Sequence, residues 1–163
     1  MPDAEWEQRN AALWATLDHL PEHGFLAATD ALCGELAAGD PVAAFERAAA
    51  QDSTGHSDQA VPLYREALSG GLTGLRRRRA SIQLASSLRN LGALEESLAL
   101  LQAELDAPSD ELDDAVAAFL ALALADAGRE REALSLALTA LAAHLPRYQR
   151  SLANYASDLD SDE

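Results

Sequence analysis

One short pattern recurs three times along the chain: a glycine, four mainly polar residues, a small residue and then an aliphatic one. Its copies start at Gly55, Gly92 and Gly128, so the spacings are 37 and 36 residues. A glycine at such a place closes one helix because it adopts a left-handed backbone without steric cost, and the small residue lets the next helix approach its partner. Each copy is therefore predicted to be the corner between two antiparallel helices.

The composition agrees with a chain made only of helices. Ala and Leu make up about two-fifths of the residues, and β-branched apolar residues are rare. Proline, glycine and short polar clusters divide the chain into roughly nine helices. After each corner the second helix is predicted to point a stripe of side chains inward, and in the second copy this stripe is Ser97, Leu101 and Leu105.

These residues resemble the tetratricopeptide repeat family. The family's pattern is a small residue before the corner, glycine at the corner, and then alanine, an aromatic residue and alanine. In the first copy it matches Ala48, Gly55, Ala60, Tyr64 and Ala67. The resemblance covers most of the chain and, in its middle, extends to a group of short bacterial members of the family. It implies an all-α fold, a right-handed superhelix of antiparallel helix pairs.

We expect one structural domain, because 163 residues are too few for two ordinary ones. Residues 41–145 are predicted to form three repeat-like helix pairs. Helix pairs of this kind bury their apolar faces only by stacking, so the end units must differ from the rest. We assign residues 1–40 to an N-terminal helix pair that packs on the repeats, residues 146–156 to a C-terminal capping helix, and residues 157–163 to an acidic disordered tail.

The charge and the apolar segments exclude several classes of partner. A net charge of −15 repels phosphate backbones, so we expect neither nucleic-acid nor membrane binding. The most apolar stretch, residues 115–125, is too short to cross a bilayer. No secretory signal is visible, which predicts a cytoplasmic location, and the use of Arg without Lys favours a bacterial origin. Cys33 is the only cysteine and is predicted to be a small buried side chain.

No pattern in the sequence predicts catalysis. There is no nucleophile motif, no glycine-rich phosphate loop and no cluster of metal ligands, so we expect no catalytic residue, cofactor or metal. The main interpretation is a non-catalytic adaptor that binds a peptide or a partner protein, or a second copy of itself in a homodimer. The alternative is a helical ligand-binding domain or an accessory or regulatory subunit of an enzyme.

Four consecutive arginines, Arg76 to Arg79, are the strongest local signal, since they lie at the start of a predicted helix where the helix dipole disfavours cations. They either pair with acidic residues of the chain or bind a partner. The resemblance implies that the first helix of each pair lines a concave groove. By offset, the groove residues are Phe45, Ala49, Asp52, Arg79, Ile82, Ser86, Arg89, Asn90, Leu122 and Asp126.

Within this groove, we hypothesise that Arg79, Arg89 and Asn90 recognise a carboxylate, either a chain terminus or an acidic side chain. Phe45 and Ile82 would then offer apolar contact to the same peptide.

Overall fold

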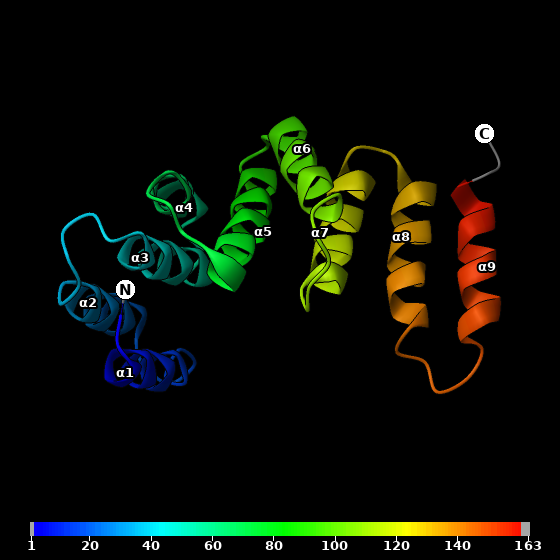
Figure 1. Cartoon of the computed structure of the whole chain (residues 1–163). Coiled ribbons are helices and arrows are strands. Elements are labelled where there is room, and N and C mark those ends of the chain that lie inside the picture. Colours follow the sequence, from blue (N-terminus) through cyan, green and yellow to red (C-terminus); the bar gives the residue numbers. More distant parts are fainter. Residues whose placement is uncertain (1, 161–163) are drawn as a thin grey trace. The chain divides into compact units, whose positions relative to one another are not determined.

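The computed structural model describes residues 2–160, which form nine α-helices and no β-strand, so the all-α fold class is confirmed for this part of the chain. In chain order the helices are α1 (Ala4–Trp14), α2 (Glu22–Cys33), α3 (Pro41–Ser53), α4 (Ser57–Ser69), α5 (Gly74–Asn90), α6 (Leu94–Leu105), α7 (Asp113–Asp126), α8 (Glu130–Ala142) and α9 (Gln149–Asp160) (Figure 1). The chain divides into two compact units, Met1–Ser87 and Leu88–Glu163, with the boundary inside α5. The organisation as one domain stays a prediction.

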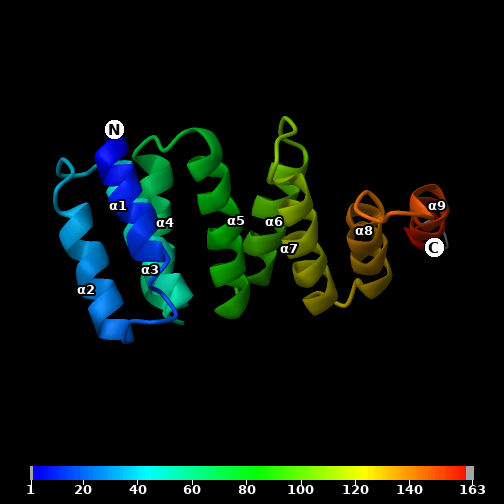
Figure 2. The same ribbon diagram turned by 90° about the horizontal axis from the view of Figure 1, so that it is seen from below.

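In the first unit, α1 packs against α2, α2 against α3, and α3 against α4 (Figure 2). The indole nitrogen of Trp6 donates to the carbonyl of Leu32 at 2.9 Å and so ties α1 to α2. Helix α3 begins as its sequence predicts: the carboxylate of Asp40 accepts from the amide of Val42 at 2.8 Å, and Pro41 occupies the first helical position. This cap fixes where α3 starts, and with it the positions of the side chains along α3.

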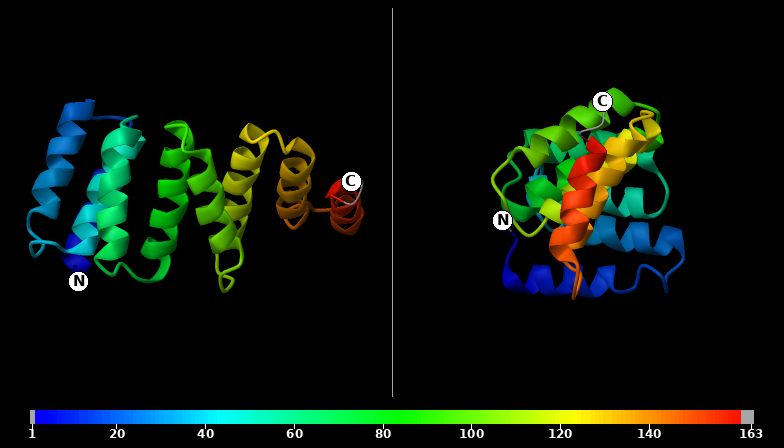
Figure 3. Two further views of the ribbon diagram at one scale, coloured as in Figure 1. Left: turned by 90° about the horizontal axis from the view of Figure 1, so that it is seen from above. Right: turned by 90° about the vertical axis from the view of Figure 1, so that its right-hand side faces the viewer.

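In the second unit, α6 packs against α7, α7 against α8, and α8 against α9 (Figure 3). Small residues occupy buried positions in the last two helices: Ala142 of α8 is 3% exposed and Ala156 of α9 is fully buried. His144 follows α8, and its Nε2 lies 2.7 Å from the carboxylate of Asp114 in the first turn of α7. These contacts hold α7, α8 and α9 as consecutive neighbours.

The three predicted corners are confirmed and share one geometry. Gly55, Gly92 and Gly128 have φ angles of 88°, 82° and 76°, the left-handed region that favours glycine. At each corner the amide of the residue after the glycine bonds to the carbonyl five residues before it, which closes the helix in a Schellman motif. These bonds join His56 to Gln51, Ala93 to Leu88 and Arg129 to Leu124, at 2.9 Å each.

Replacing Gly92 with alanine should therefore lower the free energy of unfolding by about 1 kcal/mol, because an L residue is strained at this φ although its Cβ has room. Gly24→Ala is the matched control. Gly24 lies in the first turn of α2, and a Cβ there would make only an ordinary contact, at 3.8 Å from Cδ of Pro21. The control should raise the free energy of unfolding by about 0.5 kcal/mol. Urea unfolding measures both, and a Gly92→Ala variant as stable as wild type would contradict the strain.

The stripe of side chains after each corner follows the prediction in the first copy and departs from it in the other two, since in the third copy Ala133 is buried but Ala137 and Ala140 are only half-buried. In the first copy Ala60, Tyr64 and Ala67 are fully buried, as their spacing predicts. In the second copy the prediction of Leu105 as an inward residue is wrong, because Leu105 is 37% exposed and Glu104 is 5% exposed. Glu104 follows Leu101 by three residues, as Ala67 follows Tyr64, so the helical register puts Glu104 at the matching position and Leu105 beside it. The buried stripe of the second copy is therefore Ser97, Leu101 and Glu104.

Ser97→Ala should raise the free energy of unfolding by about 1 kcal/mol, because a buried hydroxyl without a hydrogen bond keeps its desolvation cost. Ser97 is fully buried, and its Oγ has no hydrogen-bond partner among the described residues. The matching positions in the other two copies hold Ala60 and Ala133, which shows that a methyl group fits there. Thermal unfolding of the variant checks this expectation, and a lower midpoint would mean that the hydroxyl makes a stabilising bond.

The predicted N-terminal helix pair, residues 1–40, corresponds to α1 and α2, and the C-terminal bound differs from the prediction. α1 ends at Trp14, because the next residues form tighter turns and the Thr16 hydroxyl donates to the carbonyl of Leu13 at 2.6 Å. α2 ends at Cys33. α9 reaches Asp160, so residues 157–160 of the predicted tail are helical, and residues 161–163 lie outside the described part.

Candidate functional site

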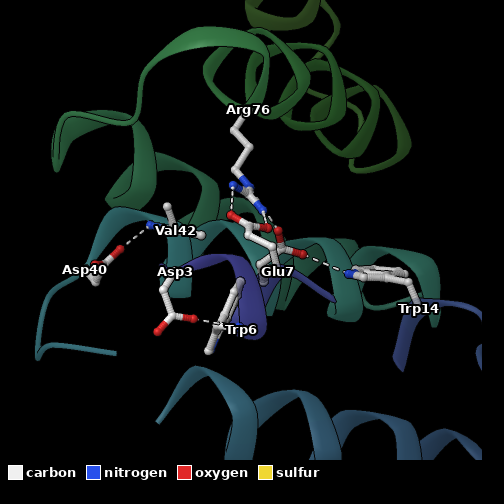
Figure 4. A network of polar contacts seen from close by, with 8 residues as sticks. Asp3, Trp6, Glu7, Trp14, Asp40, Val42 and Arg76 are labelled. Carbon is white, nitrogen blue, oxygen red and sulfur yellow. Dashed lines mark hydrogen bonds and ion pairs between the residues drawn. The ribbon is translucent and has the colours of Figure 1, made fainter. Parts of the chain in front are cut away.

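Arg76, the first of the four arginines, is held by two acidic residues of the first unit (Figure 4). Its two terminal nitrogens donate to the carboxylate of Glu7 at 2.8 and 2.5 Å, and its Nε donates to Glu46 at 3.1 Å. Glu46 is only 2% exposed and also accepts from the indole nitrogen of Trp14 at 2.8 Å. The bonds to Glu7 raise the pKa of Arg76, against the opposing effect of burial. For Arg76 the alternative of internal pairing therefore holds.

Arg79 lies three residues further along α5 and has a different environment. Its guanidinium carbon lies 5.2 Å from the centroid of the Phe45 ring, within the range of a cation–π contact. The side chain is exposed, and no carboxylate of the described residues forms an ion pair with it. A guanidinium stacked through its face keeps its N–H groups at the edges, where they can donate to a carboxylate.

Three predicted groove residues of the first unit are buried. Phe45 is fully buried, Ala49 is 1% exposed and Ile82 is 4% exposed. The ring of Phe45 lies 6.3 Å from that of Tyr64, besides its contact with Arg79. In this structure these side chains are therefore covered and expose no surface that a peptide could contact. The ring of Phe45 instead contacts the guanidinium of Arg79.

Asp52 joins three helices of the first unit. Its carboxylate accepts from the hydroxyl of Ser87 at 2.7 Å and lies 3.4 Å from the hydroxyl of Tyr64 and from that of Ser57. Burial and the nearby carboxylate raise the pKa of Tyr64 far above its usual range. Asp52 thus links α3 to α4 and α5, while Ser86, also predicted in the groove, is half-buried on α5.

The second unit brings together two of its four predicted groove residues. Nη1 of Arg89 lies 2.6 Å from Oδ2 of Asp126, and the two side chains are 24% and 51% exposed. Leu122 stands one turn before Asp126 on α7 and is 48% exposed, and Asn90 lies at the end of α5. The remaining predicted residues belong to the first unit, so a common groove that includes both sets stays a prediction.

A pocket of about 460 Å³ in the first unit was not predicted from the sequence. It is formed by α1, the start of α3 and the turn between α4 and α5. The loops carry ordinary turn signals, Gly70-Gly71 before α5 and Asp40-Pro41 before α3, which locate the turns but not a cavity between them. The residues that line it are Pro2, Glu7, Asp40, Pro41, Val42, Gly71, Leu72, Thr73, Leu75 and Arg76.

Across the described residues, the cysteine is buried and no cluster of metal-ligand side chains is present. Cys33 is buried, as predicted, and burial raises the pKa of its thiol to about 11, so little thiolate forms near neutral pH. Within residues 2–160, no group of three or more His, Cys, Asp or Glu side chains is arranged to hold a metal ion. None of the helices in that range has the length and apolar character needed to cross a bilayer.

Comparison with protein families gives one match. A family model described as Tetratrico peptide repeat matches residues 41–159, which include all three glycine corners. A search of curated proteins and a search of solved structures each found no match. The family match covers well over half of the chain and agrees with the helix pairs and their corners. The chain therefore belongs to the tetratricopeptide repeat family.

Proposed function

We propose that this protein is a non-catalytic scaffold that binds a peptide or a partner protein, and that Arg79 recognises a carboxylate of that partner. Tetratricopeptide repeats support protein–protein interaction in general, which is the coarser part of the proposal. The finer part rests on one observation: the guanidinium of Arg79 is exposed and stacked on a buried ring, with no carboxylate of the described residues paired to it.

The other predicted cations are less suited to this role. Arg76 already binds Glu7 and Glu46, and Arg89 binds Asp126. A ligand carboxylate at either place would have to displace an existing partner, whereas at Arg79 it would replace only water. The stack on Phe45 also reduces the entropy that Arg79 loses on binding, because its side chain is already ordered.

The partner's carboxylate can be a chain terminus or an acidic side chain, and a peptide library distinguishes the two. We expect wild-type protein to enrich a set of peptides with free C-termini, and the same peptides with amidated C-termini to bind about ten-fold more weakly. If amidation has no effect but acidic side chains are enriched, the side chain is the ligand. Binding is measured by fluorescence anisotropy on the enriched peptides.

The test of Arg79 itself compares Arg79→Gln with Arg129→Gln. Arg129 is also an exposed arginine, but it pairs with Glu132 three residues later and lies in the second unit. Arg79→Gln should weaken binding of the enriched peptides about ten-fold, and Arg129→Gln should leave it unchanged. Equal binding by wild type and Arg79→Gln would remove the carboxylate role and leave the general scaffold role standing.

A homodimer is the second candidate, and α9 carries the observation that favours it. Tyr155 on α9 is 70% exposed and Tyr148, just before the helix, is 77% exposed. Two exposed aromatic rings on one helix and directly before it form an apolar surface that a second copy of the chain can cover. Sedimentation at high micromolar concentration tests this, and a monomer there counts against it. Cytoplasmic location and bacterial origin stay predictions.

A further inference from the structure

The pocket in the first unit has an apolar floor and an acidic wall. Val42 and Leu72 are 7% and 6% exposed, and Leu75 at the opening is 44% exposed. We propose that this pocket receives an aliphatic side chain from a basic segment of a partner protein. Its volume of about 460 Å³ is within the range of pockets that bind small apolar ligands, roughly 300 to 1,000 Å³.

Leu75 is a partly exposed aliphatic side chain at the opening of the pocket. It lies in the first turn of α5, directly before the four arginines, and it lines the pocket with almost half of its surface in water. Together with Val42 and Leu72 it makes three aliphatic side chains around one cavity. An aliphatic side chain that enters the cavity would remove part of this surface from water, which is the main favourable term in such binding.

The charges around the pocket select a basic partner. Its charged lining consists of Glu7, Asp40 and Arg76 (Figure 4). The guanidinium of Arg76 is already bound by Glu7 and by the buried Glu46. The described lining residues thus carry two carboxylates and one guanidinium, a formal sum of −1. The chain as a whole carries −15, so it also attracts basic segments from a distance.

Three short peptides with blocked ends test the two parts of this proposal. The first contains Lys-Leu-Lys between glycines, the second Glu-Leu-Glu and the third Lys-Ser-Lys. In an amide NMR titration of the full chain, we expect Lys-Leu-Lys to shift the resonances of Val42, Leu72, Thr73 and Leu75. It should bind at least about ten-fold tighter than either of the other peptides, because each lacks one of the two features.

The result that would overturn the charge argument is equal or tighter binding of Glu-Leu-Glu. If Lys-Ser-Lys binds as tightly as Lys-Leu-Lys, charge on the surface accounts for the binding and the pocket does not take part. If none of the three peptides shifts the resonances of the lining residues, the pocket is not a binding site for such segments.

Leu75→Ser and Leu134→Ser provide matched variants, since both leucines are surface residues, 44% and 49% exposed, and Leu134 lies in α8 of the second unit. Leu75→Ser should weaken the Lys-Leu-Lys peptide at least about five-fold, while Leu134→Ser should not change its affinity. Far-UV circular dichroism shows that each variant is folded. A Leu75→Ser variant that binds like wild type contradicts the proposal.

This inference rests on the scaffold role of the chain but not on the carboxylate site at Arg79. The two tests use peptides of opposite charge and variants of different residues. If Arg79→Gln binds the enriched peptides like wild type while Lys-Leu-Lys still binds the pocket, only the carboxylate site is contradicted. If Arg79→Gln weakens peptide binding while Lys-Leu-Lys does not bind, only the pocket proposal is contradicted.

Discussion

Replacing Arg76 with methionine should lower the free energy of unfolding by about 2 to 3 kcal/mol, because it leaves a buried carboxylate without its cation. Glu46 is 2% exposed and would keep only the bond from the indole of Trp14. Methionine retains most of the aliphatic stem, so the loss of packing is small. The expected cost is below the largest values for buried pairs because the side chain of Arg76 is itself 26% exposed. Urea unfolding measures it.

The control for Arg76→Met is the double variant Arg76→Met with Glu46→Gln. The glutamine amide is neutral and can still accept the hydrogen bond of Trp14 through its oxygen. Glu7 also loses its partner, but its side chain is 38% exposed and water can solvate it. We expect the double variant to recover most of the lost stability. If it is no more stable than Arg76→Met alone, an unpaired charge on Glu46 is not the cause of the loss.

The helix corners could be predicted from sequence because their signals are local. Gly92 and Gly128 each end a helix through bonds that span five residues, and the small residue that follows lies within the next turn. The register of the following helix was harder to predict. Leu105 has the apolar character of an inward residue, but the position three residues after Leu101 is occupied by Glu104. At this place the spacing of the repeat predicts the buried residue correctly, and the polarity of the side chain does not.

The partners of the site residues could not be predicted from sequence, because they depend on contacts between distant segments. Arg76 binds Glu46 at a separation of 30 residues and Glu7 at a separation of 69 residues. The position of Phe45 in the repeat predicts which face of α3 it lies on. It does not predict which side chain of another helix packs over that face. In the structure Arg79 lies above Phe45. The apolar contact predicted for a peptide is thus already made within the chain.

Tyr64→Ala should lower the free energy of unfolding by about 3 to 5 kcal/mol, which is more than the loss expected for Arg76→Met. Tyr64 is the largest side chain of the first unit's buried stripe and is fully buried between Ala60 and Ala67 along α4. Its ring also lies 6.3 Å from that of Phe45, which supports Arg79. Alanine would leave a cavity that the flanking alanines are too small to fill. Because Phe45 loses a neighbour, binding at Arg79 should weaken as well. Urea unfolding and peptide anisotropy measure the two effects.

Tyr64→Phe separates the ring from its hydroxyl. The hydroxyl lies 3.4 Å from Asp52, a long hydrogen bond, whereas Ser87 donates to the same carboxylate at 2.7 Å. Loss of the hydroxyl should therefore cost less than about 1 kcal/mol, and binding at Arg79 should not change. The position is filled by Leu101 in the second copy and by Ala137 in the third, so a polar group there is not required by the repeat. A Tyr64→Phe variant as unstable as Tyr64→Ala would place the stabilisation in the hydroxyl and its link to Asp52, and the packing of the ring would then be secondary.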